Sequence, residues 1–388
     1  MAGHRSRTLD SEAGDRPTPA AGDGGGMIEF WQTNNPAKQW QPDAAQRVEA
    51  DGWTGQVFMD SQSLTADPYV VMGNWAATSE RLRLATYVTN PLTRHPAVTA
   101  AAAATLQAIS GGRAVLGIGR GDSALAYLGY APVGLAAFNR VLNDLQTLLR
   151  GGEVAFDVTA GDAPSLDSLS LGDKPTASRL QWLPEGMPKV PMDVAATGPK
   201  VIRMAAPIAE RLTVSVGAMP ERVAWALDQA RAARAEQGLS ADGVAFGAHI
   251  VVICHPDRAV IRQSAETFVT PLARFQVIQR DAAGPKSPDD DRNFEAIRRG
   301  YDMTKHAQRD TEQGKVVGDA IDERFIDRFA VTGTPDECTE RLLELVALGV
   351  ERFICVGPGI HPEAAAPDRT LFASEVIPQV RAALGATA

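Results

Sequence analysis

The sequence predicts an α/β protein that folds as a single (β/α)8 barrel with insertions. From Met27 onward, short apolar runs alternate with longer amphipathic runs, the pattern of parallel strands joined by helical crossovers. The pattern repeats eight times, the number of units that closes into a barrel, and 388 residues suit a barrel with insertions. An open, doubly wound sheet is the competing architecture. It is disfavoured because no strand–glycine loop–helix unit stands at the start of the chain.

The strand candidates are short runs rich in apolar residues, as expected of strands buried on both faces. In chain order they are Ile28–Trp31, Trp53–Met59, Leu82–Val88, Ala114–Ile118, Val190–Ala195, Leu212–Val216, Val244–Cys254 and Arg352–Val356.

The helix candidates show helical spacing of apolar residues and recognisable start and stop signals. Pro96 opens an alanine-rich helix that Gly111 and Gly112 end, because proline suits a first helical turn and glycine a helix end. In chain order the candidates are Ala44–Ala50, Pro68–Thr78, Pro96–Ser110, Leu135–Arg150, Pro199–Ala209, Glu221–Gln237, Asp257–Leu272, Asp336–Leu348 and Phe372–Leu384.

Three segments fall outside this alternation. Residues 1–26 are rich in Gly, Pro, Ser, Asp and Arg, have no apolar core, and are expected to form a disordered N-terminal extension. Residues 27–388 then form one domain, with excursions at about 151–189 and 274–330 that are expected to cover the barrel mouth.

Composition limits the function classes. A net charge of −9 argues against a nucleic-acid partner, and no apolar run is long enough to cross a membrane. The three cysteines show no CxxC spacing, which favours reduced thiols in a cytoplasmic protein. The six histidines form no ligand-spaced pair, so no metal site is expected.

Barrel enzymes carry their sites on the loops that follow the strands. One such loop, Gly117–Asp122, contains a GxGxG pattern, but no acidic residue closes a second strand about twenty residues on, as a dinucleotide fold requires. We interpret Gly119 and Gly121 as positions where the backbone approaches a flat ring, with the Asp122 carboxylate at the rim facing it. The alternative is a tight turn in which Asp122 caps the next helix.

A second loop, Ala196-Thr197-Gly198-Pro199-Lys200, joins a strand to a helix. Free amides at the helix start, with the Thr197 hydroxyl and the Lys200 charge, favour a phosphate site. Simple helix capping explains the same residues equally well.

A third loop, Thr86–Pro91, ends its strand in polar groups that would point into the mouth. His95 follows it directly. Because His95-Pro96 also marks a helix start, we expect His95 to be structural rather than catalytic.

At these loops the sequence resembles the luciferase-like family of barrel oxidoreductases, in particular its branch of coenzyme F420-dependent methylenetetrahydromethanopterin reductases. The resemblance covers nearly all of residues 27–384 except the two excursions. The segments that carry it are Val88–Thr99, Ile109–Arg113, Leu116–Asp122, Ala196–Lys200, Val331–Pro335 and Phe372–Pro378.

The resemblance implies roles for particular residues. A non-prolyl cis peptide between Tyr87 and Val88 would form a bulge, continued by Thr89 and Asn90, that supports the cofactor ring. Ala196, Thr197, Gly198 and Pro199 would bind the cofactor phosphate, and Gly217 and Ala218 would add a further phosphate contact. Asp122 would lie near the reacting carbon.

One departure from the family pattern concerns the loop after the second strand. Asp60 is retained there as a catalytic and cofactor-binding candidate, but the histidine that follows it in several relatives is replaced by Ser61. A sugar-alcohol dehydrogenase reaction, which needs that histidine as a base, is therefore disfavoured.

The resemblance thus implies an oxidoreductase that transfers a hydride between coenzyme F420 and a small organic substrate, with Asp122 or a water supplying a proton. The first alternative is a monooxygenase of the same family that uses reduced FMN and O2. The second is a barrel that binds ligands without catalysis. A homodimer is expected from the relatives.

Overall fold

Eight parallel strands close into a barrel, which confirms the predicted fold class. The structure, a computed structural model, describes residues 27–33, 39–156, 164–278, 281–306, 321–358 and 371–385. Around the barrel the strands are β1 (Glu29–Thr33), β2 (Gly55–Phe58), β3 (Arg83–Thr86), β4 (Ala114–Ile118), β7 (Met192–Ala196), β8 (Arg211–Val214), β9 (Ala245–Cys254) and β11 (Arg352–Val356). Pairing of β11 with β1 and of β8 with β9 closes the ring.

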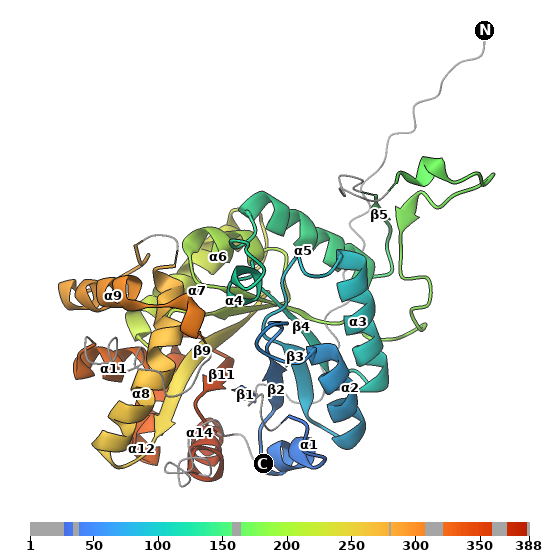
Figure 1. The fold of residues 1–388 in the computed structure, drawn as a ribbon. Helices are drawn as coiled ribbons and strands as arrows, with labels where there is room; N and C mark the ends of the chain where they lie inside the picture. Colours follow the sequence, from blue (N-terminus) through green and yellow to red (C-terminus); the bar gives the residue numbers. More distant parts are fainter. Residues whose placement is uncertain are drawn as a thin grey trace.

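Helices surround the strands on the outside (Figure 1). They are α1 (Ala44–Ala50), α2 (Pro68–Thr78), α3 (Pro96–Ile109), α5 (Leu135–Leu149), α6 (Pro199–Ala205), α7 (Pro220–Ala235), α8 (Arg258–Ala273), α12 (Pro335–Ala347) and α14 (Ile377–Ala383), the last preceded by a π-helical turn over Phe372–Val376. The start of α3 confirms the structural role expected for His95, because its Nδ1 accepts a hydrogen bond from the Ala97 amide at 3.2 Å.

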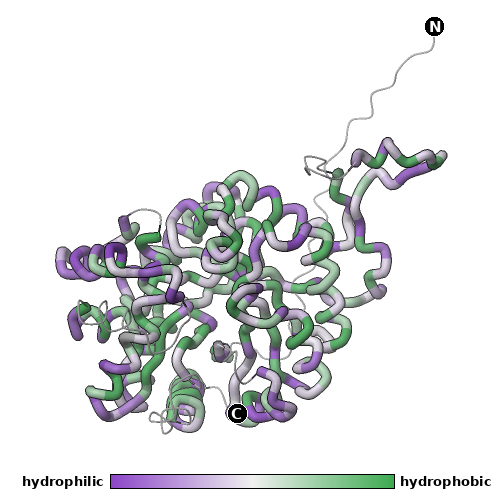
Figure 2. Tube along the Cα trace, viewed as in Figure 1, coloured by the Kyte–Doolittle hydropathy of each residue, from purple (hydrophilic) through white to green (hydrophobic). Residues whose placement is uncertain are grey.

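Side chains alternate along each strand and build two apolar layers. The outward side chains pack against the helices in one large buried cluster. A smaller cluster fills the middle of the barrel and contains Trp31, Val57, Ala85, Val115 and Ile354. Figure 2 shows the same division, with the strands apolar and the outer faces of the helices mixed.

A buried ion network fills the amino-terminal end of the barrel. Arg83, the first residue of β3, donates to Glu29 at 2.9 Å, and Arg211 pairs with the same carboxylate. Arg352 Nη2 lies 2.9 Å from Asp193. These charged side chains occupy the amino-terminal end of the barrel, opposite the carboxyl ends of the strands.

Glu29 makes the network sensitive to acid. Burial alone would raise the pKa of Glu29, but the guanidinium of Arg211, with those of Arg352 and Arg83, outweighs burial and lowers the pKa from 4.5 to about 2. A carboxyl whose folded-state pKa is depressed stabilises the fold fully above the unfolded value. That stability is lost as the pH falls from 4.5 through 2.

We therefore expect the free energy of unfolding to fall by about 3 kcal/mol between pH 6 and pH 2 through this group alone. Urea unfolding at several pH values measures it. In Glu29→Gln the protein should be less stable at pH 6 and its acid dependence shallower, whereas the exposed Glu344→Gln should keep the wild-type slope. Equal slopes for wild type and Glu29→Gln would contradict the assignment.

Two additions extend the barrel. The strand β10 (Val331–Gly333), which was not predicted from the sequence, pairs with the far end of β9. Between α8 and β10 lie the short helical turn η2 (Arg274–Gln276), α9 (Pro288–Gly300), the turn η3 (Met303–Lys305) and α11 (Glu323–Phe329), which share a second apolar cluster with β9.

The other addition is an arm. An antiparallel ribbon of β5 (Val154–Ala155) and β6 (Ala177–Ser178) projects away from the barrel between α5 and β7 (Figure 1). The predicted disordered extension, residues 1–26, lies outside the described residues. No helix in the described ranges has both the length and the apolar character required to cross a bilayer.

Candidate active site at the carboxyl ends of the strands

Partly exposed side chains gather where the barrel strands end, opposite the ion network. They come from five different strands or the loops that follow them, namely Met59, Tyr87, Val88, Asp122, Ala195, Thr197 and His249. In barrels of this type the active site lies at this face. Most of the site residues predicted from the sequence lie on these same loops.

The bulge after β3 forms as expected, with a cis peptide bond between Tyr87 and Val88. Tyr87 and Val88 both remain half-buried at the mouth. Their position leaves them available to a planar ligand, while their direct contact with a cofactor stays a prediction.

The glycines after β4 serve a different purpose from the one predicted. A Cβ on Gly119 would lie 2.9 Å from Val88 Cγ2, and one on Gly121, where φ is +83°, would lie 2.5 Å from Leu125 Cδ1. Protein atoms, rather than a ligand ring, thus occupy the space that these glycines leave. Gly119 and Gly121 shape the site by admitting the β3 bulge and the turn into α4 (Ser123–Ala126).

Thr89 and Asn90 lie too deep for the predicted contact through their side chains. Their exposed fractions are 0% and 1%. The Asn90 Oδ1 accepts hydrogen bonds from the amides of Leu92 and Thr93, both at 3.0 Å, and Thr89 continues the pairing with β4. The two residues hold the loop in shape, and we exclude them from the group that touches a ligand.

Asp60, predicted as a catalytic and cofactor-binding residue, lies in an ion pair between two loops. It is 2% exposed and forms an ion pair with Arg94, whose other nitrogen Nη2 bonds to Asp67 at 2.6 Å. The ion pair engages one oxygen of the carboxylate, and contact of Asp60 with a substrate or cofactor stays a prediction. Asp60 therefore joins the loop after β2 to the loop after β3.

The predicted phosphate loop leads into α6 as expected. Ala196 is the buried last residue of β7, and Gly198 precedes α6 with φ −100° and no side chain capping the helix start. The capping alternative for Thr197 is thus not observed. A Cβ on Gly198 would meet no atom within 4 Å, so the loop borders open space at Gly198. Phosphate binding there stays a prediction.

Gly217 and Ala218 do not offer the predicted phosphate contact. The Ala218 amide donates to the Phe329 carbonyl at 2.8 Å, and its carbonyl accepts from Arg341 at 2.8 Å. A Cβ on Gly217 would lie 2.6 Å from the Phe329 ring. Both residues are covered by the end of α11, a packing contact between distant segments that the local sequence does not indicate.

His249, for which no role was predicted from the sequence, faces the barrel mouth from the middle of β9. Its Nδ1 lies 3.1 Å from Ser215 Oγ, and its ring packs edge-on against Tyr87 with centroids 4.8 Å apart. Burial lowers the pKa of His249 to about 3, so the imidazole is neutral at physiological pH. The sequence signal that could have indicated His249 is a histidine within an apolar strand, at a position whose side chain faces into the barrel.

Asp122 points away from the helix it was proposed to cap. It makes no capping bond to α4, and its Oδ2 forms an ion pair with Arg274 of η2, which is 3% exposed. Asp122 therefore positions Arg274 at the mouth, and its contact with a reacting carbon stays a prediction.

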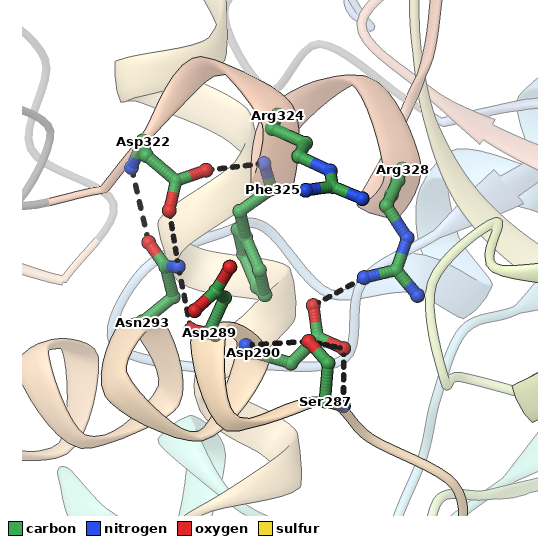
Figure 3. Close-up of a pocket in the computed structure, with 8 residues that line it drawn as sticks. All are labelled: Ser287, Asp289, Asp290, Asn293, Asp322, Arg324, Phe325 and Arg328. Carbon is green, nitrogen blue, oxygen red and sulfur yellow. Dashed lines mark hydrogen bonds and ion pairs between the residues drawn. The ribbon is translucent and has the colours of Figure 1, made fainter.

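A separate cavity of about 280 Å³ lies between α9 and α11 (Figure 3). Its polar groups largely bond to one another. Asp290 pairs with Arg328 at 2.6 Å and bonds to Ser287, and Asn293 bonds to Asp322 at 2.8 Å. These contacts hold the two helices together, so we place the active site at the strand ends and not in this cavity.

Known proteins match this chain along most of its length. The 5,10-methylenetetrahydromethanopterin reductase of Archaeoglobus fulgidus is 26% identical over 322 residues, which cover 81% of this chain and 87% of that protein. An F420-dependent glucose-6-phosphate dehydrogenase of Microbacterium testaceum is 26% identical over 320 residues, covering 80% and 82%.

Solved structures share the fold. The coenzyme F420-dependent tetrahydromethanopterin reductase of Methanopyrus kandleri superposes with a TM-score of 0.65 at 24% identity, covering 91% of this chain and 99% of that one. The oxygenating constituent of 3,6-diketocamphane monooxygenase from Pseudomonas putida, in complex with FMN, gives 0.61 at 17% identity, covering 91% and 99%. The luciferase-like monooxygenase family matches residues 29–352. With its eight-stranded barrel and its bulge after β3, the chain belongs to the luciferase-like monooxygenase family.

Proposed function

We propose that the protein is a coenzyme F420-dependent oxidoreductase that transfers a hydride between the deazaflavin and a small organic substrate at the barrel mouth. The observation that carries the proposal is similarity over four fifths of the chain to proteins named as tetrahydromethanopterin reductases and F420-dependent dehydrogenases. The half-buried side chains at the mouth, opposite the ion network, would line the site of such a ligand.

The residues at the mouth fit a planar cofactor that carries a phosphate. Tyr87 and Val88 would support the ring from the bulge, and the neutral His249 would line it from β9. Gly198 borders open space beside the exposed Lys200, which suits a phosphate group. When bound, the deazaflavin supplies the hydride chemistry, and the protein supplies orientation and exclusion of water.

An FMN-dependent monooxygenase is the second candidate, favoured by the shared fold with the FMN-bound monooxygenase. Both cofactors present a tricyclic ring and a phosphate, so the same mouth suits either. Titration of the purified protein with F420 and with FMN, followed by fluorescence, separates them. Tight FMN binding without F420 binding, together with oxygen uptake by the reduced flavin, would overturn the F420 proposal.

Gly198 allows the phosphate site to be tested by charge alone. Its backbone is extended and a side chain there has free space, so Gly198→Asp should fold and even improve the cap of α6. The added carboxylate should repel a phosphate and weaken cofactor binding by about tenfold or more. Gly198→Asn, which has the same shape without charge, should bind almost as wild type. Equal affinities of the two variants would place the phosphate elsewhere.

A further inference from the structure

The turn η2 runs from the end of α8 across the strand ends on the β4–β7–β8 side. Gln276 donates to the Ser215 carbonyl just after β8, and Arg222 donates to Gln276 Oε1 at 2.7 Å. At the other end of the turn, Arg274 pairs with Asp122 after β4. The turn therefore brings a guanidinium from the inserted segment to the edge of the proposed active site.

Arg274 has hydrogen-bonding capacity that the protein does not use. Its Nη2 engages Asp122, but Nε and Nη1 are buried and find no hydrogen-bond acceptor among the described residues. The rings of Phe275 and Tyr301 lie 4.7 Å and 5.0 Å from its Cζ and fix the guanidinium plane. Buried donors without acceptors are rare because they destabilise a fold, and an oxygen atom of a ligand would satisfy them.

Tyr301 and His306 stand beside this guanidinium. The Tyr301 hydroxyl bonds to His306 Nδ1. Burial raises the pKa of Tyr301, so the phenol keeps its proton. Burial, with the nearby Arg274 charge, lowers the pKa of His306 to about 4. The phenol and the imidazole are therefore neutral at physiological pH.

The charges of the cluster decide the kind of oxygen that it accepts. Asp122 already balances Arg274, so an anionic group would have to compete with the Asp122 carboxylate for one guanidinium. A neutral, polarised oxygen faces no such repulsion. The cluster consequently suits a carbonyl oxygen better than a carboxylate or a phosphate.

We propose that Arg274 and Tyr301 bind the oxygen of a neutral carbonyl substrate, with Tyr301 as its proton donor in place of the histidine missing after Asp60. This rests on the proposed function, because the reduced deazaflavin is the hydride donor. The carbonyl carbon accepts the hydride and the C=O π electrons move to oxygen. The oxygen takes the Tyr301 proton, and water reprotonates Tyr301 through His306. The carbonyl is reduced to an alcohol as the deazaflavin is oxidised by two electrons.

The test uses the full-length protein, reduced F420 and two matched pairs of probes, acetone with pyruvate and 4-phenylbutan-2-one with 2-oxo-4-phenylbutanoate. Each pair shares a ketone and differs in one carboxylate. Oxidation of F420 should follow addition of the ketones and be at least about tenfold slower with the oxo acids at equal concentration. Preference for the oxo acids, or no reaction with any probe while F420 binds, would overturn this inference and leave the cofactor assignment intact.

Variants of Arg274 and Tyr301 separate the binding of the ketone oxygen from the donation of the proton. Arg274→Gln should raise the KM of the ketone by about tenfold or more, since a hydrogen bond from a charged group is lost. Tyr301→Phe should lower kcat by about 100-fold with little change in KM. The exposed Arg299→Gln and Tyr130→Phe are the controls and should behave as wild type. Unchanged kinetics in either test variant would contradict its role.

Two further measurements guard against loss of the fold. The double variant Asp122→Asn/Arg274→Gln leaves no unpaired charge and should fold as wild type while still binding the ketone weakly. Saturation-transfer NMR with 4-phenylbutan-2-one reads binding without turnover, and its signal should be clearly weaker in Arg274→Gln but unchanged in Arg299→Gln. F420 affinity of all variants should stay within about threefold of wild type. If the wild-type protein itself fails to bind F420, it is the proposed function that falls.

Discussion

Asp193→Ala is expected to destabilise the protein by about 3–5 kcal/mol, because it removes a carboxylate from the ion network inside the barrel. Asp193 is 4% exposed and pairs with Arg352, which is 1% exposed. Arg352 and Arg211 would then face each other's positive charge with Glu29 as the remaining carboxylate of the network. Arg352 is buried and Arg211 is 8% exposed, so water can offset little of this repulsion.

Urea unfolding measures this effect. Asp193→Asn should retain a hydrogen bond to Thr213, whose hydroxyl now lies 2.8 Å from the carboxylate, and should lose somewhat less stability than Asp193→Ala. The exposed Asp289→Ala, which breaks a surface pair with Arg292, should change stability by less than about 0.5 kcal/mol. A loss below about 1 kcal/mol in Asp193→Ala would show that water or rearrangement compensates the charge.

Gly117→Ala is expected to have an effect of similar size for a steric reason. A Cβ at this position in β4 would lie 1.9 Å from the Thr86 carbonyl oxygen, which belongs to the backbone and cannot rotate away. The end of β3 must therefore shift, and the Tyr87–Val88 bulge would move with it. We expect a loss of about 3 kcal/mol or more, at the upper limit for overpacking, together with weakened cofactor binding.

Thermal or urea unfolding and F420 titration report these two effects separately. Gly172→Ala is the matched control, because its Cβ would meet nothing within 4 Å and its stability should be unaffected. If Gly117→Ala lost stability while binding F420 as wild type, the bulge would not be the support of the ring.

The barrel could be predicted because each of its strands appears in the sequence as a short apolar run of neighbouring residues. All eight strand candidates lie within two residues of the observed boundaries, since strands buried on both faces are continuous apolar runs. The strand β10 could not be found in this way. It has three residues, and it exists because β9 extends beyond the barrel and offers a free edge.

The site was less predictable, since its contacts join residues that are distant in the chain. The cis peptide at Tyr87–Val88 was expected from the family resemblance, and the sequence around Asp122 indicated a loop that follows β4 at the carboxyl ends of the strands. Nothing near Asp122 indicates Arg274 as its partner, and nothing near Gly217 indicates that Phe329 covers it. The ion pair of Asp60 was missed for the same reason, because its partner Arg94 lies on a different loop.

The extension of β9 has a consequence for how such enzymes diversify. The segment between α8 and β10 shares its apolar cluster with α8 and the far end of β9, and β10 pairs with the overhanging end of β9. It can be exchanged as a cassette only if its contacts with the loop after β8 are kept, because Gln276 donates to the Ser215 carbonyl and the Ala218 amide donates to Phe329. Because Arg274 and Tyr301 belong to that cassette, replacement of one segment would alter substrate choice while the cofactor loops stay as they are. Recombination at Ala273 and Val331 is thus a rational way to engineer new specificities on this scaffold.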